Sequence, residues 1–315
     1  MSLHKRLDIL VVGSLTLDQI FQVTRLPERN FEAEVIDSGT FFGGRAPNVA
    51  AMAAKLGLRT GIVSAVGDDF RSSGYERHLS KLRVDLSGVT VVPGQKTRQT
   101  LIFSDPEGNQ ITFLNFRPEK YSGQMEVPVG MIRKSKVVHL SSSGDYRFNV
   151  RCASSARQNG ALVSFDIGND PFTEIPEYLK GMIKHTSFLF GNDAEVSGVL
   201  DRLKVASVEG LLNFGPPMLT VVVIEKKSRS SVIYSREEVE HVPSAIRNMK
   251  DPSGGSDGYV AGFLTGYLGG HDWRTAGILG AVEASFIVEK MGCQTNLPDR
   301  NQLVTRSREL FGLSL

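Results

Sequence analysis

Short, almost continuous runs of apolar residues recur along the chain, and segments with helical spacing separate most of them. The runs span residues 7–14, 60–66, 136–141, 161–166, 187–191 and 218–224. A strand that is covered by helices on both faces has such a run rather than an alternation of apolar and polar residues. The pattern therefore predicts an α/β fold with a doubly wound, mainly parallel sheet flanked by helices.

Helix signals are clear in three of the intervening or following segments. Residues 45–56 are rich in alanine, with Pro47 in the first turn and Gly57 just past the end. Proline early in a helix and glycine beyond its end are the usual start and stop signals. Residues 258–268 and 273–291 are predicted as two further helices that are rich in small residues.

Two stretches have a β pattern that the regular alternation does not explain. Residues 97–104 and 110–116 are β-prone and are joined by Asp-Pro-Glu-Gly, a good turn sequence, which predicts a hairpin. Residues 31–42 are also β-prone, although a doubly wound fold usually has a helix after its first strand. Together these stretches predict a small sheet that stands off the main domain.

The chain is expected to form one domain, residues 1–315, with a lid of approximately residues 15–42 and 95–118 inserted in it. At 315 residues and 41% hydrophobic content it can bury one large core. We see no internal repeat, low-complexity tract or linker that would divide it.

Charge and cysteine content argue against several classes of protein. The 36 basic and 34 acidic residues nearly cancel, so nothing favours a nucleic-acid or membrane partner. Cys152 and Cys293 lie far apart without CxxC spacing, which argues against a disulfide framework or zinc site, although one disulfide stays open. The N-terminus lacks signal-peptide features, and no stretch is apolar enough to span a bilayer. We therefore expect a cytoplasmic protein.

The segment at residues 251–257, Asp-Pro-Ser-Gly-Gly-Ser-Asp, leads into a predicted helix. Unpaired N–H groups and the positive end of the helix dipole make such a loop a natural receptor for a phosphoryl group. Phosphoryl transfer also needs a carboxylate that accepts the proton of the acceptor hydroxyl, and Asp257 is placed for this role. Taken alone, Asp257 could equally be a helix cap or first-turn acid.

A second glycine-rich turn, Phe-Phe-Gly-Gly-Arg-Ala-Pro-Asn, ends one β-prone segment and opens a helix. Gly43 and Gly44 would let a polar ligand approach the main chain, and Asn48 offers a donor and an acceptor to sugar hydroxyls. An ordinary strand-to-helix turn would explain the same residues. Asp18 follows the first strand at the sheet edge where α/β folds bind ligands, although a lone surface acid is an equally simple explanation.

In this order, the motifs resemble those of the PfkB family of ribokinase-like kinases. They are Gly-Ser-x-x-x-Asp ending at Asp18, Gly-Gly-x-x-x-Asn ending at Asn48, a hairpin, and Asp-x-x-Gly-x-x-Asp ending at Asp257. The Val-Gly-Asp-Asp-Phe at residues 66–70 also resembles the segment after the family's second strand. The likeness covers nearly the whole chain and implies a ribokinase-like fold with a small β-sheet lid.

The resemblance implies a kinase that transfers the γ-phosphate of ATP to a primary hydroxyl of a sugar or nucleoside. Asp257 would be the general base, and Gly254, Gly255 and Ser256 would form the anion hole. An Asp-Pro start to this loop, as at Pro252, is similar to what we expect of prokaryotic nucleoside kinases in the family.

Substrate hydroxyls would be bound, by the same resemblance, by Asp18, Gly43, Gly44 and Asn48. Asn192 and Glu195 match the family's Asn-x-x-Glu element, which is associated with magnesium and phosphate placement. A capped helix start would explain that element as well. ATP and Mg²⁺ would be the cofactors, no residue is assigned as a direct metal ligand, and the lid would also form a homodimer contact.

The sequence departs from the family in two places. Pro252 replaces a threonine and removes a backbone donor, and Ser256 replaces a glycine, so its Cβ would crowd a phosphoryl group if its φ were positive. After residues 220–224 the family's Thr-x-Gly is missing, and Lys226, Lys227 and Arg229 stand there instead. These could meet phosphates or be a solvated surface run, so the phosphate donor stays open.

Two alternatives to an active kinase remain. A weak or inactive sugar or nucleoside binder on the same fold would keep the substrate residues and lose the donor site. A dinucleotide-dependent oxidoreductase is disfavoured because Gly-x-Gly-x-x-Gly is missing after the first strand. The sequence leaves open the oligomeric state, any monovalent cation near Asp251, and the substrate, although Phe113, Phe116 and Tyr121 could stack on a nucleobase.

Overall fold

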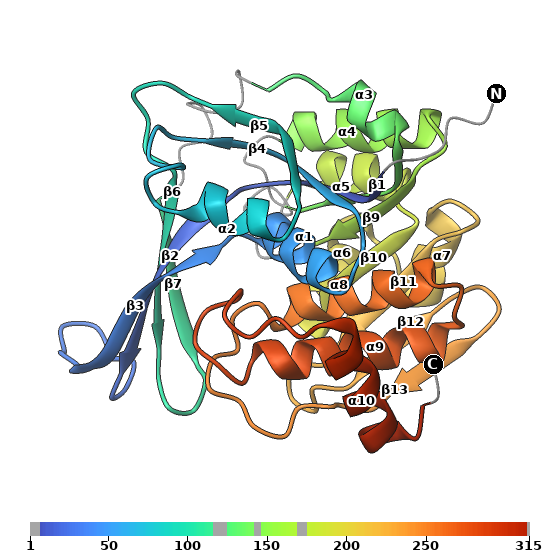
Figure 1. Ribbon diagram of the computed structural model, residues 1–315. Helices are drawn as coiled ribbons and strands as arrows, with labels where there is room; N and C mark the ends of the chain where they lie inside the picture. Colours follow the sequence, from blue (N-terminus) through green and yellow to red (C-terminus); the bar gives the residue numbers. More distant parts are fainter. Residues whose placement is uncertain (1–6, 116–124, 142–145, 169–174, 314–315) are drawn as a thin grey trace.

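The computed structural model describes residues 7–115, 125–141, 146–168 and 175–313, and they form a large sheet between two layers of helices (Figure 1). The strands from β11 to β5 run parallel, and β12 and β13 are antiparallel additions at one edge. Across the sheet the strands are β13 (Val239–Val242), β12 (Ser231–Tyr234), β11 (Thr220–Ile224), β10 (Phe188–Asn192), β9 (Leu162–Asp166), β8 (Ser135–Leu140), β1 (Leu7–Val12), β4 (Thr60–Val66) and β5 (Asp85–Val91). Each of the predicted apolar runs forms one of the parallel strands.

Both faces of this sheet carry helices. One layer contains α1 (Arg45–Lys55), α2 (Tyr75–Lys81), α8 (Gly255–Leu268), α9 (Trp273–Ile287) and α10 (Arg300–Phe311), and the other contains α3 (Val129–Arg133), α4 (Tyr146–Gln158), α5 (Pro176–Ile183), α6 (Asp193–Leu203) and α7 (Val208–Phe214). Along β1, Ile9 and Val11 pack into the core under the first layer, and Leu10 and Val12 pack under the second. Burial on both sides is the physical reason for the unbroken apolar runs.

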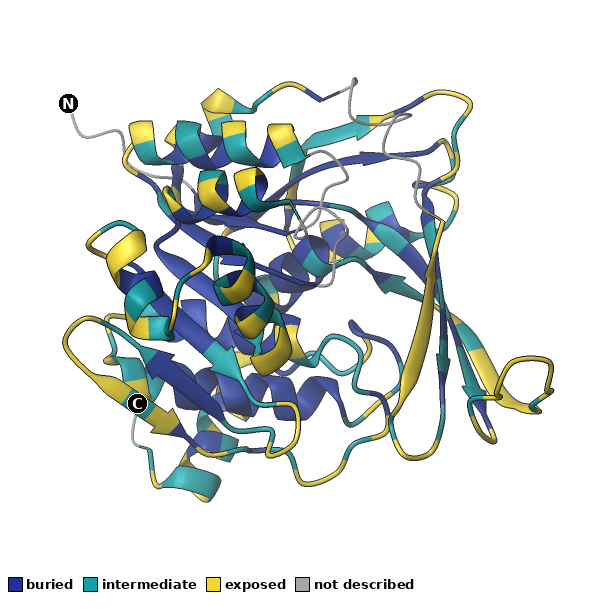
Figure 2. Cartoon of the chain, turned by 180° about the vertical axis from the view of Figure 1, so that it is seen from behind, coloured by how far each residue is buried: buried dark blue, intermediate teal, exposed yellow. Residues whose placement is uncertain are grey.

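A second sheet stands beside the main domain, as the hairpin and the early β-prone segment predict. Its strands, in order, are β3 (Val35–Gly43), β2 (Thr16–Val23), β6 (Arg98–Ser104) and β7 (Gln110–Leu114). β2 pairs with β3 antiparallel and with β6 parallel. Figure 2 shows exposed residues along its outer strands, and Phe113 and Leu114 are each 57% exposed.

Several element limits differ from the sequence expectation. In the early β-prone segment the strand starts at Val35, and residues 31–34 form a loop, whereas residues 16–23 form an additional strand. The apolar runs do not predict β5, β12 and β13, because β5 and β13 are partly exposed strands at the two edges of the large sheet and β12 has only four residues. Residues 116–118, expected in the lid, lie outside the described residues.

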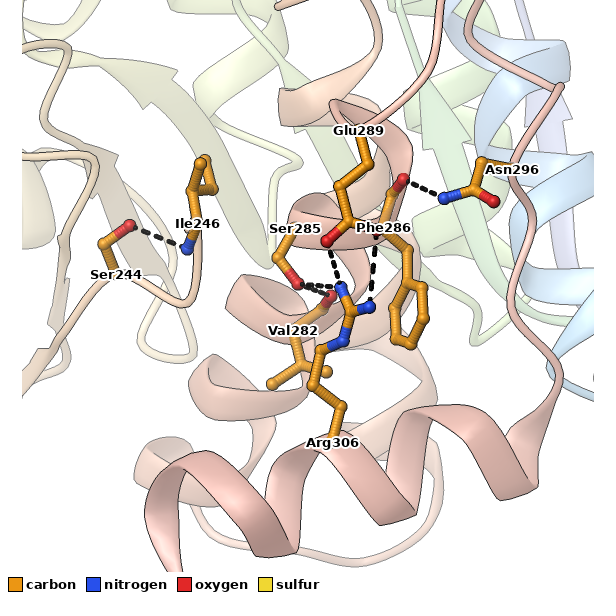
Figure 3. Close-up of polar contacts among 8 residues, drawn as sticks. All are labelled: Ser244, Ile246, Val282, Ser285, Phe286, Glu289, Asn296 and Arg306. Atoms are coloured by element: carbon orange, nitrogen blue, oxygen red, sulfur yellow. Dashed lines mark hydrogen bonds and ion pairs between the residues drawn. The ribbon is translucent and has the colours of Figure 1, made fainter. Parts of the chain in front are cut away.

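The last two helices are firmly joined near the end of α9, which stops at Ile287 rather than at the predicted residue 291. Arg306 of α10 bonds Glu289 at 2.8 Å and the Ser285 hydroxyl at 3.0 Å, and its guanidinium lies 3.3 Å from the Phe286 ring centroid (Figure 3). Asn296 donates to the Phe286 carbonyl at 2.6 Å. These contacts fix the segment that follows α9.

The described helices include none with the length and apolar character that a membrane span requires. Cys152 and Cys293 are both buried and are not joined by a disulfide.

Glu283 is a buried carboxyl within α9. Its side chain is fully buried, and neither oxygen has a hydrogen-bond partner in the part of the chain that the structure describes. Burial raises the pKa of Glu283 well above its usual value. Such a group weakens folding as the pH rises above its unfolded-state pKa, because the unfolded chain ionises more readily.

We expect Glu283→Leu to raise the free energy of unfolding at pH 7 by about 1–3 kcal/mol, since leucine needs no hydrogen bond. Below pH 4.5 both states of the wild type are protonated, so the advantage should shrink there. Urea unfolding at pH 4 and pH 7 would measure this, with Glu309→Leu on the exposed side of α10 as control. If Glu283→Leu were less stable than the wild type by the same amount at both pH values, this prediction would be wrong.

Candidate active site

The loop at residues 251–257 turns into α8 through Gly254, the N-cap residue. Gly254 has a φ of 77°, and a Cβ there would lie 2.8 Å from the Cβ of Cys293. Ser256 lies in the first helical turn and is not in the left-handed region, so its Cβ causes no backbone strain. The Gly255 N–H donates to the Pro252 carbonyl at 3.2 Å. The turn therefore accommodates Ser256 without strain, and it already uses the N–H of Gly255, one of the three residues predicted for the anion hole.

Asp257 is buried in the first turn of α8, with 4% of its surface exposed. Asn48 Nδ2 donates to its Oδ2 atom at 2.8 Å. Burial and the neighbouring Asp166 raise the pKa of Asp257 to about 7, against the opposing effects of Asn48 and Arg45. A carboxylate with this pKa can accept a proton near neutral pH.

Asp18 and the diglycine fit closely against each other on β2 and β3. Asp18 is buried, accepts from the Thr16 hydroxyl at 2.6 Å, and has its pKa raised to about 6, mainly by burial. A Cβ on Gly43 would lie 1.8 Å from Asp18 Oδ2, so only glycine fits beside this carboxylate. Gly44, with a φ of 100°, is the N-cap of α1. The four predicted substrate residues thus come from adjoining segments, with Asn48 one turn into α1.

Arg45, the first residue of α1, was not among the predicted site residues. Its Nη1 atom lies 3.3 Å from Asp166 Oδ2 at the carboxyl end of β9. The charge of Arg45 acts on Asp166, Asp257 and Glu195. Asp166 is the last residue of the buried strand β9, and an acid at the end of an apolar run is a signal that the sequence does contain.

A pocket of about 300 Å³ opens beside these groups and is lined by both Arg45 and Asp166. Asn192 and Glu195 also line it and form a capping box at the start of α6, with bonds of 3.0 and 2.9 Å. Burial and Asp166 raise the pKa of Glu195. Asn192 and Glu195 therefore cap the start of α6, and both residues also line the pocket.

The basic segment after β11 lies at the same pocket. Lys226 and Arg229 line it together with Pro252, Gly255 and Ser256 of the α8 loop. The chain thus places cations where the family's Thr-x-Gly is missing. Of the aromatic side chains proposed to stack on a base, Phe113 contacts Phe103 edge-on, with ring centroids 6.1 Å apart. Phe116 and Tyr121 lie outside the described residues.

The family model for pfkB carbohydrate kinases matches residues 6–300. The chain belongs to this family. It is 37% identical over 304 residues to a nucleoside kinase from Methanocaldococcus jannaschii, covering 95% of this chain and 96% of that protein. It is 35% identical over 305 residues to a nucleoside kinase from Methanothermobacter thermautotrophicus, covering 97% of each. It is therefore an enzyme, a sugar or nucleoside kinase.

Solved structures of family members confirm the predicted ribokinase-like fold. The crystal structure of the M. jannaschii kinase matches with a TM-score of 0.83 and 34% identity, covering 97% of this chain and 99% of that one. A Burkholderia thailandensis nucleoside kinase in complex with inosine matches with a TM-score of 0.86 and 23% identity, covering 98% and 100%. The mainly parallel sheet and the small second sheet of this kinase are thus family features.

Proposed function

We propose that this kinase phosphorylates a primary hydroxyl of nucleosides with ATP and Mg²⁺, using Asp257 as the general base. The observation that carries the proposal is the buried Asp257 carboxylate in the first turn of α8, beside a pocket lined by cations. Its pKa of about 7 suits proton transfer at neutral pH. The nucleoside class is favoured over a simple sugar because two relatives at 35% and 37% identity are nucleoside kinases.

In the proposed mechanism the diglycine, Asp18 and Asn48 hold the ribose hydroxyls. Asp257 takes the proton of the attacking hydroxyl. The hydroxyl oxygen bonds to the γ-phosphorus of ATP as the bond from that phosphorus to the ADP leaving group breaks. First-turn N–H groups, such as those of Ser256 and Asp257, have no partner within the helix and would be available to the phosphoryl oxygens. Arg45 adds a positive charge on the same side.

The pocket residues suit a magnesium ion that is carried by the nucleotide. The described part of the chain contains no group of three or more His, Cys, Asp or Glu side chains arranged to hold a metal. Mg²⁺ in kinases usually takes one or two carboxylates and keeps phosphate and water ligands. Glu195, whose cap uses only the Oε2 atom, and Asp166 would be those carboxylates. When bound, the ion would neutralise charge on the phosphates.

We also propose that the small sheet forms a homodimer contact. Large apolar side chains are exposed on it, among them Val35, Ile36, Phe113 and Leu114. They lie on the two edge strands of this sheet, β3 and β7, and exposed apolar surface is typical of an interface between proteins. A cytoplasmic location remains our proposal on the sequence grounds given above.

The direct test is an assay of ADP release with a panel of nucleosides and free sugars, followed by NMR of the products. We expect at least one nucleoside to yield a monophosphate on its primary hydroxyl, with a kcat/KM at least about tenfold above that of ribose. Thermal stabilisation by nucleosides without any ADP release would instead favour the inactive binder. Turnover of free sugars alone would contradict the nucleoside class.

A further inference from the structure

A chain of hydrogen bonds connects the proposed base with the diglycine. Asn48 Nδ2 donates to Asp257 Oδ2 at 2.8 Å, and Asn48 Oδ1 accepts from Gln294 Nε2 at 2.8 Å. Gln294 Nε2 also donates to the Tyr75 hydroxyl at 2.7 Å. The Tyr75 hydroxyl donates to the Gly43 carbonyl at 2.8 Å. The chain thus joins α8, α1, the segment after α9, α2 and the end of β3.

The direction of every bond in this chain is set at one end. The Gly43 carbonyl can only accept, so Tyr75 must donate to it and offer its oxygen lone pairs to Gln294. The amide nitrogen of Gln294 must therefore face Tyr75, and its second hydrogen faces Asn48 Oδ1. Asn48 must then present its own N–H to Asp257. The Oδ2 atom of Asp257 is bound in this way, and Oδ1 is left for a substrate proton.

His78 completes the arrangement on the other side of Gln294. Its Nε2 atom lies 2.9 Å from Gln294 Oε1, which can only accept, so His78 carries a hydrogen on Nε2. Phe42, which precedes the diglycine, lies against both α2 rings, with centroids 4.5 Å from Tyr75 and 4.9 Å from His78. Both hydrogens and the oxygen of the Gln294 amide are therefore engaged.

Gln294 is fixed in place by the segment that carries it. Gly292 N–H donates to Asp251 Oδ2 at 2.8 Å, which joins this segment to the α8 loop. Asn296 donates to the Phe286 carbonyl near the end of α9, close to the bond between Arg306 and Glu289 (Figure 3). Gln294 itself is only 8% exposed. A buried amide held from both sides has little freedom to turn over.

We propose that Gln294 is a positioning residue, which orients Asn48 so that one oxygen of Asp257 is held and the other faces the substrate hydroxyl. The inference rests on the proposed role of Asp257 as the base. Through Tyr75 and Gly43 the same amide couples the base to the loop that holds the substrate. Gln294 touches neither the substrate hydroxyl nor the phosphoryl group in this arrangement.

Reversing the amide chain has a defined chemical consequence. If Gln294 became an acceptor on both sides, Asn48 would turn its oxygen toward Asp257, and only a protonated Asp257 could satisfy that contact. Other groups also act on Asp257 and stay unchanged, namely Arg45 on α1, Asp166 at the end of β9, Asp18 on β2, Tyr75 on α2 and Cys293 after α9. A shift of the acid limb in the pH profile of kcat would then reflect the changed orientation of the Asn48 amide.

The test compares Gln294→Glu and Gln294→Met with the wild type in pH profiles of kcat and KM. We expect Gln294→Glu to move the acid limb of kcat upward by about one pH unit or more, a loss of about tenfold at pH 6 that shrinks at pH 9. Gln294→Met carries no charge and should lower kcat at all pH values, with a smaller shift of the limb. The KM for ATP should stay within about twofold in both variants.

Gln158→Glu on the exposed side of α4 provides the same chemical change away from the site and should leave both profiles unchanged. Tyr75→Phe combined with Gln294→Met should lose clearly less than the product of the single losses, because both act through one chain. An active wild type whose acid limb is unmoved in Gln294→Glu, or full additivity of the double variant, would overturn the inference. An inactive wild type would overturn the proposed function itself.

Discussion

Asp257→Asn is expected to lower kcat by roughly 10²–10⁴-fold, because asparagine cannot accept the proton of the attacking hydroxyl. The KM for the nucleoside should change far less, since the amide can still contact Asn48 and the diglycine is untouched. The first-turn N–H groups of α8 also remain. Steady-state kinetics at pH 8, where the wild-type carboxylate is ionised, would measure the loss.

The same variant should be more stable than the wild type at neutral pH. The folded-state pKa of Asp257 is about 7 and its unfolded-state value is 3.8, so the wild type loses stability as the pH rises between them. Asparagine does not ionise, and its advantage should vanish below pH 4. Asp201→Asn on the exposed side of α6 provides a control. Unchanged turnover in Asp257→Asn would rule out the proposed base.

Arg45→Met is expected to lower kcat/KM by roughly 10²–10³-fold, the usual cost of removing one preorganised charge from a transition state. Arg45 lies 3.3 Å from Asp166 and lines the pocket together with Ser256, the neighbour of Asp257 in the chain. Its charge also lowers the pKa of Asp257, so the acid limb of the pH profile should move upward in the variant. Kinetics between pH 6 and 9 would separate the two effects.

Arg45→Lys keeps the charge but loses the planar fork, and we expect it to recover only part of the activity. Asp166→Asn in the Arg45→Met background removes the carboxylate that would otherwise be left unpaired. If the double variant regained full activity, Arg45 would serve only to neutralise Asp166. A loss confined to the KM for ATP would likewise exclude a role at the transferring phosphoryl group.

The sequence by itself determined the layered α/β fold and the main site loops. Strands buried on both faces must be apolar along their whole length, so the order of the runs was readable before any contact was known. Gly43 ends a strand and Asn48 lies in the first turn of the helix that follows, while Asp18 comes soon after the first strand, and these positions have local signals. The strand β13 lacks such a signal, because it pairs at the sheet edge and is only partly buried, and β12 has only four residues.

Only the tertiary structure decided how the base is surrounded. Gln294 bonds Asn48 across 246 positions, and Arg45 meets Asp166 across 121, so neither pair leaves a trace in local composition. The structure also settled the backbone at Ser256, because a positive φ is a property of the turn, and the turn gives it to Gly254 instead. Long-range packing fixes these contacts, since side-chain amides and charges find their partners only after the sheet and helices assemble.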